Sequence, residues 1–384
     1  MIFDYGTLKL IWWLLVGILL IGFAIADGMD MGVGMLLPFL GKNDSERRVI
    51  INTVGPHWDG NQVWLITAGG AIFAAWPAVY AAAFSGFYLA MLLVLMGLFF
   101  RPVGFDYRSK LTDPTWRNTW DWGLFAGGLV PALIFGVAFG NLLQGVPFHL
   151  DQFLKPHYDQ KFIWALLPLL NPFALLAGLI SVAMLAMHGA VWLQMRTEYP
   201  LDERARDAVG KLAPAVTVLF ALAGLWVAFG IDGYRVVSGP AADALPNPLA
   251  KLVVREAGAW MAIYGAHPIA MLAPALGLVM PIATLFMSRA KRPGLAFVTS
   301  SLAMAGIIAT AGLSMFPFVM PSSSNPGSSF TAWDATSSHL TLTVMFWAVV
   351  IFLPIVLSYT LWCYRRMWGK VTVAEIEKRA HSAY

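Results

Sequence analysis

Nine apolar segments, each close to the length that crosses a lipid bilayer, follow one another along the 384-residue chain. A hydrocarbon core about 30 Å thick is spanned by about 20 helical residues. Backbone amides in hydrocarbon must be hydrogen-bonded within the protein, which leaves only helices or closed barrels as spanning structures. We therefore expect one all-α integral membrane domain, residues 1–384, with nine transmembrane helices near 8–30, 58–76, 79–100, 122–143, 162–190, 210–231, 261–287, 294–317 and 339–363.

Charge is scarce, and this excludes several kinds of protein. Charged residues make up 12% of the chain, against about 25% in soluble domains, so most of the surface is expected to face the lipid bilayer. The net charge of +4 comes without the basic stripe that nucleic acid requires, so no nucleic-acid partner is expected. The second predicted span is marginal because its first residues are polar.

The distribution of lysine and arginine predicts the orientation, because inner loops of membrane proteins are enriched in them. With the N-terminus outside and the C-terminus inside, 19 of the 25 basic residues fall on the inner side. An even number of helices would place both termini on one side and weaken this asymmetry. The pattern therefore favours nine spans.

Asp27 and Asp30 follow a charge-free apolar run and share one helical face. Carboxylates at the edge of the hydrocarbon are costly, so they are candidates for a functional site. They could relay protons or serve as buried partners of Arg101; the alternative is snorkelling to the headgroups, which suits longer side chains better. Neighbouring glycines permit close helix approach and favour burial. These glycines are Gly28, Gly32 and Gly34.

The segment from His57 to Trp64 is rich in polar and aromatic residues at the expected inner end of the second span. His57, Asn61 and Trp64 share one helical face. Asp59 and Gln62 share another. Such a segment could line a hydrated path for protons. It could equally be a capped helix start with an interfacial tryptophan, in which Asp59 gains from the helix dipole.

Arg101 and Asp121 are both expected at inner helix ends, where they could form a two-point ion pair. The alternative is an interfacial arginine without a special partner. Because a proline disfavours helix in the residue before it, Arg101-Pro102 also predicts the end of a helix.

Cofactor chemistry is not expected in this chain. A haem within the membrane needs axial ligands such as histidine, and only His188 of seven histidines lies clearly within a predicted span. The chain has one cysteine and lacks the Walker A, HExxH and CxxC motifs. We therefore expect no haem, no metal and no nucleotide site.

Several long segments are similar to one known family. The segments are 26–34 (ADGMDMGVG), 56–64 (PHWDGNQVW), 100–108 (FRPVGFDYR), 316–323 (FPFVMPSS) and 333–338 (WDATSS). In this order they resemble subunit II of cytochrome bd-type quinol oxidases, and the likeness runs through the whole chain.

The resemblance implies a heterodimer in the bacterial inner (cytoplasmic) membrane, with the N-terminus of this chain periplasmic and its C-terminus cytoplasmic. The complex oxidises ubiquinol or menaquinol, reduces O2 to water and generates proton-motive force. Subunit I carries two b haems and one d haem. Subunit II has two four-helix bundles plus one peripheral helix. Whether a quinone or small single-helix accessory subunits bind to it stays open.

The resemblance also implies roles for residues, none of them catalytic. Asp59 is expected to take up protons, with His57 and Gln62 as neighbours, and Trp64 is expected beside the oxygen route. A buried polar cluster is expected to support the haem site of the partner. Its members are Asp27, Asp30, Arg101 and Asp121.

Two rival functions are weighed against this interpretation. A secondary transporter would place ionisable residues near the bilayer midplane and show inverted repeats, whereas here the acids lie toward the inner edge and no repeat is evident. A purely structural membrane scaffold would tolerate replacement of the inner acids without loss of turnover.

Overall fold

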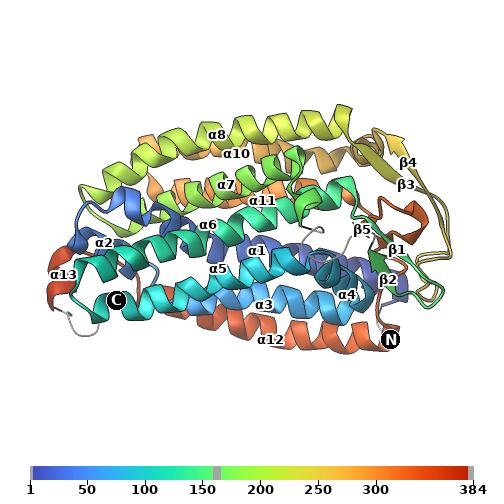
Figure 1. Cartoon of the computed structure of the whole chain (residues 1–384), viewed down its shortest axis with the longest axis horizontal. Coiled ribbons are helices and arrows are strands. Elements are labelled where there is room, and N and C mark those ends of the chain that lie inside the picture. Colours follow the sequence, from blue (N-terminus) through green and yellow to red (C-terminus); the bar gives the residue numbers. More distant parts are fainter. Residues whose placement is uncertain (1–2, 159–165, 379–384) are drawn as a thin grey trace.

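A computed structural model describes residues 3–158 and 166–378 of the chain. Long helices run side by side along the longest axis of the molecule (Figure 1). The first residues of the span predicted at 162–190, and the C-terminal Tyr384, lie outside the described residues. The helices are α1 (Tyr5–Leu40), α2 (Asp44–Asn52), α3 (Trp58–Ala75), α4 (Pro77–Gly86), α5 (Tyr88–Tyr107), α6 (Pro114–Gln144), α7 (Pro172–Arg196), α8 (Leu201–Gly230), α9 (Ala262–Ala266), α10 (Leu272–Arg289), α11 (Pro293–Met315), α12 (His339–Arg366) and α13 (Val373–Lys378).

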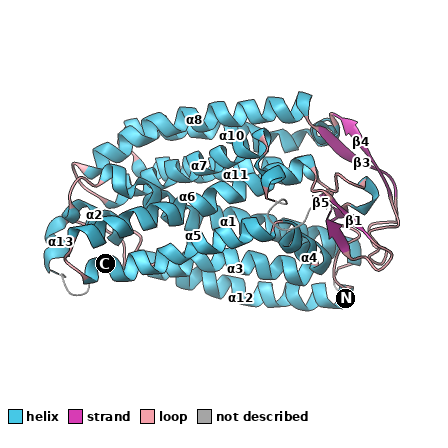
Figure 2. Cartoon of the chain, viewed as in Figure 1, coloured by secondary structure: helices cyan, strands magenta, loops and turns pink. Residues whose placement is uncertain are grey.

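Short antiparallel hairpins gather at the end of the molecule where α1 begins, while α2 and α13 lie at the opposite end (Figure 2). Each hairpin joins two neighbouring strands of the chain. The strands are β1 (Phe148–Leu150), β2 (Pro156–Tyr158), β3 (Asp232–Ser238), β4 (Leu252–Ala257), β5 (Phe318–Met320) and β6 (Phe330–Thr331). We use outer end as a label for the strand-bearing end and inner end for the end with α2.

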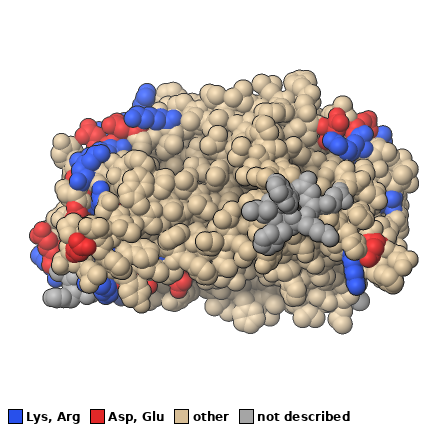
Figure 3. All heavy atoms as spheres, viewed as in Figure 1, with Lys and Arg blue, Asp and Glu red and all other residues tan. Residues whose placement is uncertain are grey.

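Eight helices within the described ranges are long and apolar enough to cross a membrane. These eight candidate spans are formed by α1, α5, α6, α7, α8, α10, α11 and α12. Charged side chains gather at the two ends of the face in Figure 3, with a broad uncharged belt between them. The chain is thus a multi-pass membrane protein. Helix α3, with 18 residues and a polar first turn, is outside this set of eight.

The range predicted as one helix at 79–100 is divided between α4 and α5, with Phe87 between them. A Cβ on Gly86 would lie 2.5 Å from the ring of Tyr158, so the absence of a side chain admits this ring. The Tyr158 hydroxyl in turn donates a hydrogen bond to the carbonyl of Ala82 near the end of α4. The break in the helix is therefore stabilised by a strand residue from the outer end.

The helix end predicted at Arg101-Pro102 is wrong, because α5 continues through Pro102 to Tyr107. Proline removes one backbone hydrogen bond, and transmembrane helices tolerate this where neighbouring helices pack against them. Helix α5 packs along α6 and a Cβ on Gly104 would lie 2.6 Å from the Leu124 side chain. Arg101 therefore lies within a helix, not at its end.

The predicted span at 261–287 is also interrupted, since α9 ends before Pro268 and α10 begins at Leu272. His267 lies outside the α-helical region, with φ −133° and ψ 83°, and a residue before proline disfavours that region. Several other helices extend beyond the apolar runs. The extended helices include α1, α6 and α8. The apolar runs therefore locate the spans, but they underestimate the lengths of the helices.

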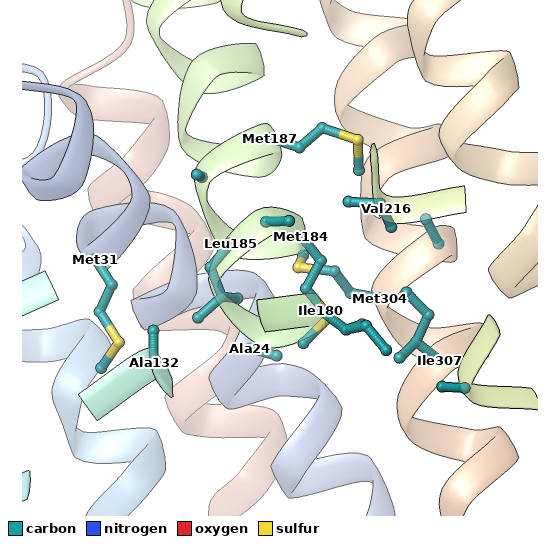
Figure 4. Close-up of a cluster of buried hydrophobic side chains, with 14 of the residues drawn as sticks. Ala24, Met31, Ala132, Ile180, Met184, Leu185, Met187, Val216, Met304 and Ile307 are labelled. Atoms are coloured by element: carbon teal, nitrogen blue, oxygen red, sulfur yellow. The ribbon is translucent and has the colours of Figure 1, made fainter. Parts of the chain in front are cut away.

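Helix α7 lies at the centre of the apolar core. Figure 4 shows Leu185 of α7 among side chains from α1 and α6, and Met184 beside Met304 of α11. Helix α12 differs sharply, because Leu342 is its one buried residue. Its other residues are exposed or half-buried.

Two glycines let α1 and α7 cross at close range. A Cβ on Gly32 would lie 2.1 Å from the carbonyl oxygen of Leu185, and one on Gly189 would lie 2.5 Å from the backbone of Gly32. Real side chains do not fit at these distances. This crossing lies directly after Asp30 in the sequence, so it fixes the inner half of α1, with its two carboxylates, inside the bundle.

Candidate functional site

Asp27 of α1 and Arg101 of α5 form a buried two-point ion pair. Arg101 Nη1 donates to Asp27 Oδ2 over 2.8 Å, and Nη2 donates to Oδ1. Both side chains are almost fully enclosed, with 0% and 2% of the residue surface exposed. A bidentate arginine–carboxylate pair is among the strongest polar contacts available in a protein interior.

Asp30 lies in the same cluster but is less well compensated. Its Oδ2 accepts a hydrogen bond from Asn61 over 2.9 Å and lies 3.9 Å from Arg101 Nη2. Its Oδ1 is buried, has no hydrogen-bond partner among the described residues and lies 3.9 Å from His57 Nδ1. One arginine thus faces two carboxylates, and one carboxylate oxygen has spare capacity to accept a proton or a water molecule.

Asn61 and His57 extend the cluster toward the start of α3. Asn61 Nδ2 lies 3.1 Å from His57 Nδ1, and His57 Nε2 lies 3.1 Å from the carbonyl of Thr53. Because the amide nitrogen donates, Nδ1 accepts and the imidazole proton is on Nε2. His57 is therefore held as the neutral tautomer.

The other α3 residues singled out in the sequence occupy a different environment. Asp59 is exposed in the first turn, Gln62 is half-buried, and half-buried Trp64 packs over Gly22, whose Cβ would lie 2.8 Å from the indole ring. The N-cap residue is His57, so Asp59 does not cap the helix. Asp59 thus stands at the open edge of α3 near the buried cluster.

The expected ion pair between Arg101 and Asp121 does not form. Asp121 accepts hydrogen bonds from Arg108 Nε over 2.5 Å and from Arg47 Nη1 over 2.8 Å. The physical reason is that α5 does not end at Pro102: its continuation carries Arg108 toward Asp121, while Arg101 turns toward α1. The predicted polar cluster is therefore two clusters, one around Asp27 and Asp30 and one around Asp121.

Tyr364 of α12 is a site residue that sequence reasoning did not single out. Its hydroxyl donates to Asn61 Oδ1 over 2.8 Å, and its ring lies 4.7 Å from the His57 ring, centroid to centroid. Tyr364 lies near the end of an apolar helix, next to Arg365 and Arg366. This sequence pattern does not indicate a hydrogen bond to a residue of α3.

The outer end holds a separate set of buried charges. Lys251 Nζ lies 2.9 Å from Asp334 Oδ2, with only 2% and 6% of these side chains exposed. Burial lowers the pKa of Lys251, and the charge of Asp334 opposes that effect. Lys9 donates to three carbonyls, including that of Trp333 over 2.6 Å. These contacts fasten the start of α1 to the segments around Ala242 and Asp334.

Metal-ligand groups and two histidines with enclosed side chains are the remaining features that bear on cofactor binding. The described residues include no group of three or more histidine, cysteine, aspartate or glutamate residues that could hold a metal ion. His188 Nδ1 lies 2.7 Å from the Ser300 hydroxyl and Nε2 lies 3.2 Å from the carbonyl of Ile25. Both ring nitrogens of His188, like both ring nitrogens of His57, are therefore engaged in hydrogen bonds.

Comparisons with known proteins agree on one family. The family model described as cytochrome bd terminal oxidase subunit II matches residues 8–367. Cytochrome bd-I ubiquinol oxidase subunit 2 of Escherichia coli K12 is 60% identical over 99% of this chain and 100% of its own length. Cytochrome bd ubiquinol oxidase subunit 2 of Bacillus subtilis is 33% identical over 94% of this chain and 95% of its own length.

The fold is similar to that of a solved oxidase. A chain in the structure of bd oxidase from Geobacillus thermodenitrificans superposes with a TM-score of 0.69, covering 95% of this chain and 100% of that one. The identity is 15%, so this match speaks for the fold alone. The relatives do not favour the transporter interpretation. On the strength of the family model and the full-length relatives, this chain belongs to the family of cytochrome bd terminal oxidase subunit II.

Proposed function

We propose that this chain is the haem-free membrane subunit of an oxidase that oxidises quinol, reduces O2 to water and generates proton-motive force. The name ubiquinol oxidase, carried by its full-length relatives, supports this function. As a subunit II, the chain assembles with a subunit I in a haem-based complex. We assign the b and d haems to subunit I, because His57 and His188 already use both ring nitrogens here.

We further propose nine spans in the bacterial inner membrane, formed by the eight long apolar helices together with α3. The start of α1 would be periplasmic, and α13 and the C-terminus would be cytoplasmic. The concentration of lysine and arginine in the loops at the inner end supports this orientation. The outward-facing surface of α12 supports its role as the peripheral helix beside two four-helix bundles.

The inner-end cluster is proposed to conduct protons toward subunit I. Asp59 would collect protons from the cytoplasm, beside Gln62 and His57. The observation that carries this role is the buried Asp30 Oδ1, which lies 3.9 Å from His57 Nδ1 and lacks a hydrogen-bond partner among the described residues. A water molecule or proton there would satisfy a costly orphan acceptor.

The neighbouring residues are proposed to support this path. The ion pair of Asp27 and Arg101 would hold α1 against α5 and keep Asp30 from being a lone buried charge. Asp121, bound by Arg47 and Arg108, would steady the inner end of α6. Trp64 would lie beside the oxygen route.

Asp59→Asn in the assembled oxidase tests the proton role. Asparagine keeps the shape and polarity of the side chain but cannot carry a proton. We expect slower O2 reduction, with a loss that grows at high pH because protons become scarce, while the haem spectrum stays unchanged. The matched control is Asp106→Asn. Asp106 is also an exposed aspartate, but it lies on α5. Turnover equal to that of the control across the pH range would contradict the proposal.

A further inference from the structure

Asn61 is the residue through which α12 reaches the buried carboxylates. Its Oδ1 accepts the hydroxyl of Tyr364 over 2.8 Å, and its Nδ2 donates to Asp30 Oδ2 over 2.9 Å. Asn61 is only 2% exposed, so water does not readily replace either partner. The amide therefore links a tyrosine at the edge of the molecule to a carboxylate inside it.

The orientation of this amide matters because its two ends differ. The nitrogen end can only donate and the oxygen end can only accept hydrogen bonds. Turned by 180°, the amide would place its oxygen against the Asp30 carboxylate and lose the hydrogen bonds to Asp30 and His57. The Asp30 carboxylate, which only accepts, therefore sets the orientation of the amide. Tyr364 donates to the oxygen end that this orientation leaves free, and so anchors the side chain at its other end.

Tyr364 is itself held in place by the contacts of its helix end. Although α12 has a single buried residue, Arg196 of α7 donates to the carbonyl of Met367 over 2.7 Å. The Arg196 guanidinium lies over the rings of Trp192 and Trp368, at 5.4 and 5.7 Å from their centroids. These contacts hold the inner end of α12 against α7. Tyr364 lies in the held segment, so they also fix its position.

We infer that Tyr364 is a positioning residue, which anchors the oxygen end of the Asn61 amide and so makes the hydrogen bond from Asn61 to Asp30 depend on the placement of α12. This inference rests on the proposed role of the cluster in proton supply. The other charged or titratable groups around Asp30 are Asp27 from α1, Arg101 from α5 and His57 at the start of α3, with Arg196 of α7 beyond His57. None of them contacts the oxygen end of Asn61 among the described hydrogen bonds.

The test is Tyr364→Phe in the assembled oxidase, which removes the hydroxyl and keeps the ring beside that of His57. The readout is the infrared absorption of the Asp30 carboxyl group. Its bands are assigned by comparing the spectrum of the unchanged oxidase with that of Asp30→Asn, in which they are lost. We expect Tyr364→Phe to shift these bands, because the Asn61 amide that donates to Asp30 loses the hydrogen bond that anchors its other end. The matched control is Tyr359→Phe on the same helix, where the tyrosine is 64% exposed, and it should leave the bands in place.

Asn61→Leu supplies the second arm of the experiment. It should shift the Asp30 bands at least as far as Tyr364→Phe, and adding Tyr364→Phe to it should have no further effect. Unshifted bands in either single variant would overturn the inference. An equal additional shift in the double variant would overturn it too, because Tyr364 would then act on Asp30 by another route.

The result separates the inference from the proposed function. If the bands shift while Asp59→Asn retains full turnover, Tyr364 positions Asn61 but the cluster does not supply protons. If Asp59→Asn slows turnover while the bands stay unshifted in Tyr364→Phe, proton supply stands and the positioning role is wrong.

Discussion

Arg101 on α5 binds Asp27 on α1 through two hydrogen bonds in a site closed to solvent. The pair joins helices that are far apart in the sequence. It also places one positive charge beside two carboxylates, since Asp30 lies 3.9 Å from the same guanidinium. The charge balance of the inner half of α1 therefore depends on one side chain.

The stability effects of Arg101 and Asp27 should be strongly coupled. We expect Arg101→Leu to destabilise the subunit by about 3–5 kcal/mol, because it leaves buried carboxylates without their cation. The double variant Arg101→Leu with Asp27→Leu should lose less than the sum of the two single variants. The measurement is the thermal unfolding of the purified complex in detergent. Strict additivity of the two changes would show that the residues are not coupled.

Arg101 and Asp121 should behave in the opposite way. They belong to separate clusters, because Asp121 is bound by Arg108 and Arg47. The effects of Arg101→Leu and Asp121→Leu on stability should therefore add, within about 0.5 kcal/mol. The same unfolding assay measures this cycle. A marked deviation from additivity would indicate a direct contact that the structure does not contain.

Sequence reasoning succeeded at this site where the information was local. The three-residue spacing of Asp27 and Asp30 predicted a shared face, and the glycines beside them predicted close packing, which Gly32 makes against Leu185. Both inferences need only the geometry of one helix. The family was likewise recognisable from short runs of residues.

The partner of each charge was not predictable in the same way. Whether Arg101 or Arg108 meets Asp121 depends on whether α5 continues through Pro102, and a proline alone does not decide this. Tyr364 is a harder case, because its contact with Asn61 depends on how α12 lies beside α3 and on the clamp by Arg196. Helix packing, not local pattern, determines such contacts.

The outer-end ion pair offers a comparison between buried and exposed charges. We expect Asp334→Asn to destabilise the subunit by about 3–5 kcal/mol, because Lys251 would be left buried without its counter-charge. The matched change is Glu256→Gln, which breaks an ion pair with Arg235 whose side chains are 49% and 55% exposed. An exposed pair contributes about 0–1 kcal/mol. Equal losses of thermal stability in the two variants would contradict the assignment of Lys251 as a buried charge.

The crossing of α1 and α7 can be tested with a single methyl group. Gly32→Ala would place a Cβ 2.1 Å from the carbonyl oxygen of Leu185, which belongs to a helix backbone and cannot move aside alone. We expect the two helices to separate, so that the subunit assembles poorly or unfolds at a clearly lower temperature.

Gly17→Ala is the control for this change, because it lies on the same helix with no other atom within 4 Å of the added Cβ. Alanine is a better helix former than glycine by about 1 kcal/mol, so Gly17→Ala should leave stability unchanged or slightly raised. The two variants carry the same chemical change, and only their surroundings differ. A Gly32→Ala subunit that assembles and melts like Gly17→Ala would show that α1 and α7 do not meet at this distance, and the burial of Asp27 and Asp30 would then need another explanation.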